Sequence, residues 1–303
     1  MKKTFITLVM LLAAITLSAQ EKKIDFKNGV VNICSSSKIH ISGYDGDQVV
    51  IKSNQPDNNI FYSNTNNNFA IRGYQPGEQR VDSVSYVYFS RLGKDRSEKS
   101  EGLTPLGSAK EDPTHIDQAF EFQQAGGQLY IKDKSYDGQN VFFYHNATYE
   151  ILIPNSVKLM VSSSDCSNGN NQQFIFSSDA LKIDDFSGDL QVSSKYKAVE
   201  LTDVSGPALI NTLGGDIKVV FENEKPNALF SIISNDGDID ISMPNNSKVT
   251  MKVTGQEILS NLDFRIDQET NTANNKVLDI ALNGGGKKFD VKTEYGTVYL
   301  RKN

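Results

Sequence analysis

A short repeat in the second half of the chain restricts the folds that this sequence can adopt. The repeat has apolar residues at its first, third and sixth positions and glycine at its eighth. It occurs at residues 181–188, 199–206, 208–215, 230–237 and 289–296, with Asn235 and Glu294 at the sixth position of the last two. Alternation of apolar and polar residues is typical of a strand with one buried face. Glycine at a fixed phase indicates a sharp turn after each strand.

The glycines of this repeat are expected to occupy turn conformations that other residues reach only with strain. They are Gly188, Gly206, Gly215 and Gly237, and Gly296 is expected to be a further structural turn of the repeat. A new alternating segment starts directly after most of them, at residues 189–192, 216–219, 238–241 and 297–300. Self-similarity at a short period indicates stacked coils, because one coil cannot bury its apolar face without neighbours.

These features predict an all-β protein whose second half is a right-handed parallel β-helix-like solenoid. Four inward residues share one phase of the repeat and are expected to stack on one another: Ile183, Leu201, Ile210 and Ile232. Their neighbours by one position are expected to face solvent: Lys182, Glu200 and Asn211. An antiparallel β-sandwich, which also has turns every 8–12 residues or so, stays open as the alternative.

The first twenty residues have the three regions of a secretory signal peptide. Lys2 and Lys3 precede an apolar run over residues 5–17, and small residues follow at 18–19. We therefore expect residues 1–20 to be removed and the protein to be exported to the periplasm, the cell surface or the medium. No later segment approaches the roughly 18 apolar residues of a membrane-spanning helix, so no transmembrane segment is expected after cleavage.

Residues 149–300 resemble a bacterial family of putative adhesins of unknown function. The resemblance is carried by the Tyr-Glu-Ile-Leu-Ile-Pro strand at 149–154, by Gly-Asp-Ile or Gly-Asp-Leu at 188–190, 215–217 and 237–239, by Met-Pro at 243–244 and by the closing Gly-x-Val-x-Leu at 296–300. It implies an exported protein with a parallel β-helix-like fold, and it brings no catalytic residues.

We therefore divide the mature chain into two regions. Residues 146–303 are expected to form the β-solenoid adhesin-like domain. Residues 21–145 are expected to form an N-terminal β region, with strands near 30–33, 38–41, 48–52, 68–72, 84–89, 128–132 and 141–144. A charged segment with several prolines and glycines, near 91–118, is expected to be a surface loop inserted into that region.

Two sets of residues are candidates for ion binding or cross-linking. Asp189, Asp216 and Asp238 recur beside the glycines and are weak candidates for Ca²⁺ ligands in a stacked column. Aspartate next to glycine also stabilises turns through its own backbone, and we favour that interpretation. Cys34 and Cys166 are the only cysteines. Export permits a disulfide between them, and two free thiols are equally consistent with the sequence.

No catalytic or cofactor-binding motif is found in the sequence. The three histidines are scattered, and neither a nucleophile elbow nor a phosphate-binding loop is present. The net charge of −6 and the lack of a basic stripe exclude nucleic acid as an expected partner. We therefore predict a non-enzymatic envelope or surface protein without a cofactor, which acts as an adhesin, binding or structural module toward a glycan or an envelope protein. The alternative is a carbohydrate-active enzyme, a glycoside hydrolase or lyase on a β-helix, which needs paired carboxylates.

Overall fold

The computed structural model describes residues 20–35, 37–53, 115–133, 148–163 and 179–303. These residues form two large mixed β-sheets, so the all-β prediction is confirmed. The predicted strands near 68–72, 84–89 and 141–144 lie outside the described residues. So does the expected loop near 91–118, except for its last residues, which belong to the short helix α2 (His115–Ala119) rather than to a loop. Ile116 of this helix is fully buried.

Over the described residues, sheet A has ten strands. In spatial order they are β1 (Gln20–Asp25), β4 (Gln48–Ser53), β7 (Thr148–Pro154), β3 (Lys38–Tyr44), β9 (Leu181–Asp184), β11 (Val199–Thr202), β13 (Ile217–Val220), β15 (Ile239–Met243), β21 (Thr297–Lys302) and β17 (Glu257–Ser260). The predicted strands at 38–41, 48–52 and 149–154 are therefore confirmed as β3, β4 and β7.

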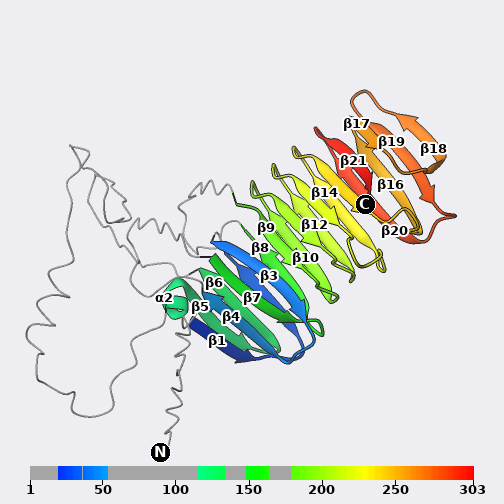
Figure 1. Cartoon of the computed structure of the whole chain (residues 1–303). Helices are drawn as coiled ribbons and strands as arrows, with labels where there is room; N and C mark the ends of the chain where they lie inside the picture. The colour runs from blue at the N-terminus through cyan, green and yellow to red at the C-terminus, as the bar shows by residue number, and fades with distance from the viewer. Residues whose placement is uncertain (1–19, 36, 54–114, 134–147, 164–178) are drawn as a thin grey trace, which may run out of the picture.

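Sheet B has eleven strands within the same described ranges. In spatial order they are β18 (Arg265–Asn271), β19 (Lys276–Leu282), β16 (Val249–Gly255), β20 (Lys287–Thr293), β14 (Phe230–Ser234), β12 (Ala208–Thr212), β10 (Asp189–Ser194), β8 (Lys158–Ser162), β2 (Val30–Cys34), β6 (Gln128–Asp133) and β5 (Phe120–Ala125). Strands from both predicted regions lie side by side in each sheet, and Figure 1 shows them following one another along a single direction.

From β7 to β17 the chain alternates between the two sheets, one strand in each. We use the term coil for one strand of sheet A, the strand of sheet B that follows it, and the turns after these two strands. From β10 to β15, each strand pairs in parallel with its equivalent in the preceding coil: Val199 of β11 aligns with Leu181 of β9, and Ala208 of β12 with Leu190 of β10. Both steps are 18 residues long (199 − 181 and 208 − 190). These parallel ladders do not agree with the alternative of an antiparallel sandwich.

The predicted inward residues are buried, but they form two stacks instead of one. Each of the four is at most 1% exposed. Leu201 aligns with Ile183 in sheet A, whereas Ile232 aligns with Ile210 in sheet B. The prediction of a single stack is wrong because copies of the repeat occur in strands of both sheets. The predicted outward residues do face away from the core: Lys182 and Asn211 are exposed, and Glu200 is half-buried on the outer face.

The repeat glycines are required by close contact between coils and not by their backbone angles. None of the five has a positive φ, so the expected strained conformation is wrong. A Cβ atom on Gly206 would instead lie 2.1 Å from the carbonyl oxygen of Gly188 in the preceding coil. The corresponding Cβ-to-oxygen distances are 2.4 Å from Gly215 to Lys197, 2.4 Å from Gly237 to Gly215, 2.4 Å from Gly296 to Gly237 and 2.5 Å from Gly188 to Val157. Any side chain at these positions pushes two coils apart.

Aspartates hold the turns at one edge of the stack. Asp185 and Asp203 begin equivalent Asp-x-Ser-Gly turns and have positive φ angles of 55° and 51°. Aspartate tolerates this conformation better than most residues. Asp203 is buried, and its carboxylate accepts hydrogen bonds from the backbone N–H groups of Glu222, Asn223 and Glu224 in the next coil. The carboxylate therefore anchors the longer turn between β13 and β14.

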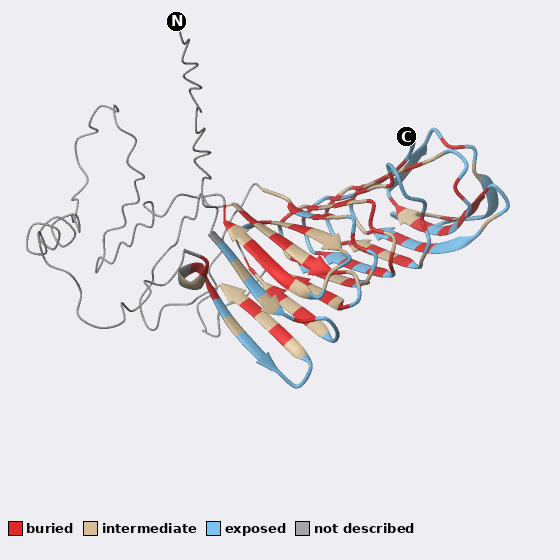
Figure 2. Cartoon of the chain, turned by 60° about the horizontal axis from the view of Figure 1, so that its bottom comes forward, coloured by how far each residue is buried: buried red, intermediate tan, exposed pale blue. Residues whose placement is uncertain are grey.

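One core fills the space between the sheets, and strands from both halves of the chain contribute to it. At the N-terminal end, the Phe120 ring of β5 contacts the Tyr149 ring of β7 edge-on, with centroids 4.7 Å apart. Further along, Phe230 and Phe289 stack with centroids 4.8 Å apart. Figure 2 shows the resulting alternation of buried and less buried residues along the strands. Inward side chains alternate with outward ones, so each sheet presents one outer face.

Candidate functional site

The outer face of sheet A carries one row of ionisable side chains whose charges alternate in sign, with His40 between the two halves of the row. Side chains at the same register follow one another across neighbouring strands: Glu21, Lys52, Glu150, His40, Lys182, Glu200, Lys218 and Asp240. We call this row the charge ladder. Lys182 Nζ donates a hydrogen bond to Glu200 Oε2 at 2.9 Å, and this bond raises the pKa of Lys182. Exposed pairs of this kind contribute at most about 1 kcal/mol each.

The outer face of sheet B is uncharged at the middle outward positions of five neighbouring strands, and Lys158 and Asp189 pair with each other at the first outward positions of β8 and β10. The two middle outward positions of β2, β8, β10, β12 and β14 are Asn32, Cys34, Met160, Ser162, Gln191, Ser193, Leu209, Asn211, Ser231 and Ile233. We call this set the neutral face. Leu209 is 41% exposed although it is apolar. Depletion of charged residues is a feature that this surface shares with the centres of binding interfaces.

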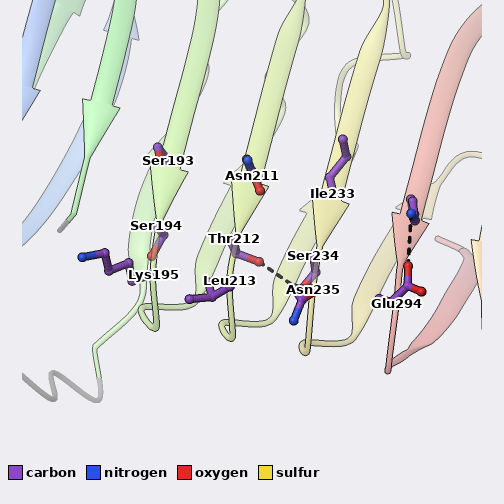
Figure 3. A pocket seen from close by; sticks show the side chains of 11 residues that line it. Ser193, Ser194, Lys195, Asn211, Thr212, Leu213, Ile233, Ser234, Asn235 and Glu294 are labelled. Carbon is purple, nitrogen blue, oxygen red and sulfur yellow. Dashed lines mark hydrogen bonds and ion pairs between the residues drawn. The ribbon is translucent and has the colours of Figure 1, made fainter.

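A groove of about 340 Å³ crosses the end of the neutral face, over β10, β12, β14 and β20. One wall is the outward row Ser193, Asn211, Ile233 and Lys292, which the strand register aligns. The other wall consists of the first turn residues after these strands: Lys195, Leu213, Asn235 and Glu294. Figure 3 shows these side chains repeating from strand to strand, with Lys195 pointing away from the others. Lys292 Nζ lies 3.1 Å from Glu294 Oε2, so this pair balances its own charge.

A row of buried hydroxyl groups lies between the two walls. The residues are Ser194, Thr212, Ser234 and Thr293, each at most 4% exposed. Thr212 Oγ1 lies 3.0 Å from Ser234 Oγ, and hydroxyls also bind their own turns: the N–H groups of Gly237 and Gly296 donate to Ser234 and Thr293. We call this row the hydroxyl ladder. These bonds fix the turns, and therefore the spacing of the groove walls.

The three weak Ca²⁺ candidates do not form one column. Asp189 begins β10 in sheet B, whereas Asp216 and Asp238 precede β13 and β15 in sheet A, at the opposite edge of the stack. Asp216 Oδ1 accepts the N–H of Asp238 (2.9 Å), and Asp238 Oδ1 accepts the N–H of Thr297 (2.8 Å). Asp189 forms an ion pair with Lys158 (3.2 Å). In the part of the chain that the structure describes, no group of three histidine, cysteine, aspartate or glutamate side chains is arranged to hold a metal ion.

Of the two cysteines, Cys34 lies among the described residues. Cys34 ends β2 and aligns with Ser162 of β8. Cys166 lies outside the described residues, four positions after Ser162. Four residues of extended chain span at most about 14 Å, and neighbouring strands are about 4.8 Å apart. The separation along the chain therefore permits the disulfide, which stays a prediction.

Two buried ionisable side chains lie where the N-terminal strands meet the repeat. Lys197 is 6% exposed, and its Nζ donates a hydrogen bond to the carbonyl oxygen of Ser37 (2.8 Å). Burial lowers the pKa of Lys197. Tyr149 is fully buried, and burial together with the charge of Asp133 raises its pKa. The bond from Lys197 to Ser37 joins the turn after β10 to the turn after β2, so it stabilises the junction.

Sequence reasoning missed the groove, although two signals for it were present. Ser or Thr lies three residues before glycine at 212–215, 234–237 and 293–296. The turns at the other edge have Asp at that position, in the pattern Asp-x-Ser-Gly, so the residue type distinguishes the two kinds of turn. Uncharged residues also recur 18 residues apart at Gln191 and Leu209, in contrast to the charges at Lys182 and Glu200. Neither signal can be assigned to a face until each strand is assigned to its sheet.

Comparisons with known proteins leave the family undecided. No family model and no curated protein matches the chain. The chain is similar to a crystal structure of a putative cell adhesion protein from Clostridium sporogenes ATCC 15579, with 10% identity and a TM-score of 0.39, over 94% of this chain and 100% of that one. Among the described residues, no helix is both long and apolar enough to span a membrane. At this TM-score and identity the likeness transfers neither a fold nor a function, and membership of the adhesin family stays a prediction.

Proposed function

We propose that the protein is an exported, non-enzymatic module of the cell envelope or cell surface that binds a ligand through the neutral face of sheet B. The observation that carries this proposal is the contrast between the two outer faces. On sheet A, Lys182 and Glu200 form an ion pair within the charge ladder, whereas the neutral face of sheet B presents uncharged side chains beside a groove. Depletion of charge at the centre of a surface favours association with a partner.

The proposed scaffold is a two-sided, right-handed parallel β-solenoid. Its support is the alternation of strands between the sheets and the parallel pairing with 18-residue steps. A right-handed path is expected because nearly all crossover connections between parallel strands have this hand. A stack of coils holds its outward side chains at a constant spacing, which suits a recognition surface that spans several coils.

The groove favours binding over glycoside hydrolysis. Hydrolysis of a glycosidic bond requires two carboxyl groups that flank the scissile bond. The groove lining contains one carboxylate, Glu294, and Lys292 is paired with it. The arrangement offers hydrogen bonds and apolar contacts without an acid–base pair.

A matched pair of substitutions tests the binding face. Ser193 in β10 and Thr202 in β11 are hydroxyl residues at the ends of consecutive strands, on the outer faces of opposite sheets. Labelled mature protein should bind cells or isolated envelopes of the source bacterium. Ser193→Glu should weaken this binding, and Thr202→Glu should leave it unchanged. Equal effects of the two variants, or no binding to any envelope fraction, would overturn the proposed function.

Export is tested separately. The mature protein should be found in the periplasmic, surface or medium fraction and should begin near residue 21, because small residues follow the apolar run of the first twenty residues. N-terminal sequencing of each fraction measures this directly. Full-length protein that retains Met1 and stays in the cytoplasm would contradict the proposed location.

A further inference from the structure

We infer that the groove across β10, β12, β14 and β20 binds an uncharged linear oligosaccharide that runs across the strands. This inference rests on the proposed binding function and specifies the ligand of the same face. A volume of about 340 Å³ lies at the lower end of the range of small-ligand clefts, which is roughly 300–1,000 Å³. A standard protein partner covers about 800 Å² of surface, much more than such a groove offers.

The geometry of the groove suits a ligand with a repeating structure. Successive strands of a sheet lie about 4.8 Å apart, so each wall presents one side chain at every such step. The backbone of the hydroxyl ladder residues forms the floor, because a residue whose side chain points inward separates the two outward rows. From Ser193 to Lys292 the wall covers three steps, or about 14 Å. The trough is therefore elongated along the stack and open to solvent at its top.

The chemistry of the walls matches a sugar ring. Asn211 and Asn235 are exposed, and a side-chain amide both donates and accepts hydrogen bonds, as sugar hydroxyl groups require. Leu213 is 46% exposed and Ile233 is partly exposed, so each wall also offers an aliphatic surface to the C–H face of a ring. The Tyr196 ring lies over Gly214, directly beside Leu213, and is 51% exposed. Aromatic side chains with a polar tip are well suited to such amphipathic ligands.

The charges of the groove argue against a polyanionic ligand. Lys292 and Glu294 neutralise each other at the C-terminal end, and a ligand carboxylate there would meet Glu294. Lys195 points away from the other lining residues (Figure 3). Over β12 and β14 the lining residues are uncharged: Asn211, Thr212, Leu213, Ile233, Ser234 and Asn235.

Calorimetric titration of the mature protein with defined sugars tests the inference. The probes are the uncharged cello-, malto-, manno- and chitohexaoses, with hexagalacturonic acid as the charged counterpart. At least one uncharged hexasaccharide should bind. Asn211→Ala and Asn235→Ala should each weaken that binding about two- to tenfold, the effect of losing one hydrogen bond. Thr202→Ala, on the other sheet, should not change it, and the unfolding midpoint of each variant confirms that it is folded.

The outcomes separate this inference from the proposed function. Binding of an uncharged hexasaccharide that depends on Asn211 and Asn235 supports both. If no uncharged hexasaccharide binds, or if the acidic one binds more tightly, the oligosaccharide inference is overturned. Envelope binding that still depends on Ser193 would then leave the binding face in place with a different ligand. Loss of both activities would overturn both proposals.

Discussion

Replacing Gly215 with alanine should force two coils apart, whereas the same change at the adjacent Gly214 should not. A Cβ atom at Gly215 would lie 2.4 Å from the backbone oxygen of Lys197, and a normal contact is at least 3.0 Å. The coils must therefore move by at least 0.6 Å (3.0 − 2.4). A Cβ atom at Gly214 would meet the exposed Tyr196 ring at 3.2 Å, and that ring can turn away.

The cost follows from the hydrogen bonds that cross this junction. The N–H of Val199 donates to Asp216 O at 2.9 Å, and the N–H of Leu213 donates to Ser194 O at 3.0 Å. A shift of 0.6 Å lengthens them to 3.5 and 3.6 Å, beyond the usual range of about 2.7–3.2 Å. Each lost bond costs about 1 kcal/mol, and the bond from the Gly214 N–H to Lys195 O (2.7 Å) crosses the same junction. Gly215→Ala should therefore destabilise the protein by about 2–4 kcal/mol.

Equilibrium urea unfolding of the mature protein measures both variants. Alanine lowers the conformational entropy of the unfolded chain relative to glycine, which stabilises the folded protein by about 0.4–1 kcal/mol. This gain applies equally to both positions and cancels in the comparison. Gly214→Ala should thus stay within about 1 kcal/mol of the unmodified protein. Similar losses at Gly214 and Gly215, or a loss below about 0.5 kcal/mol at Gly215, would refute the close-contact explanation.

Three further predictions address the core, the pH dependence and the cysteines. Leu201→Ala, at a buried position, should cost about 2–5 kcal/mol, whereas Glu200→Ala on the outer face should stay within roughly 0.5 kcal/mol; equal losses in urea unfolding would contradict the strand phase. Folded Tyr149 keeps its proton above the ordinary pKa of 10.0, so the folded state binds more protons and stability falls as the pH rises above about 10. Tyr149→Phe should remove that part of the slope, and an unchanged slope between about pH 9 and 11 would exclude this cause. Reduction of the mature protein should cost about 2–5 kcal/mol if Cys34 and Cys166 are joined, and Cys166→Ser should reproduce the loss; two reactive thiols in the unreduced, unfolded protein would exclude the bond.

Much of the strand pattern could be predicted from the sequence because alternation and glycine spacing are local signals. The strand that ends at Pro154 and the burial of Ile183 and Leu201 follow from alternation alone. The assignment of strands to sheets could not be predicted in the same way. The repeats at 181–188 and 208–215 look alike in sequence, yet their strands belong to different sheets. The inward face has the same pattern in both sheets, so the pattern does not distinguish them.

The remaining differences concern contacts between distant residues. The glycines were expected at strained angles, but the backbone of a neighbouring coil, 18 or more residues away, is what excludes a side chain. Residues 244–286 lack the glycine-spaced repeat, and they add the antiparallel strands β18 and β19 next to β16 at the end of sheet B. The groove depends on all these assignments, because its walls come from four strands that the sequence separates widely.

The charge ladder has a consequence for how the length of this stack can change. Its signs alternate from one coil to the next, with Lys182, Glu200, Lys218 and Asp240 in successive strands of sheet A. Deletion of the coil that contains Glu200 would place Lys182 beside Lys218, and like charges directly opposite each other are destabilising. Removal or duplication of two coils together keeps the alternation intact. The pair of coils is therefore the unit by which the stack can be lengthened or shortened without bringing like charges together.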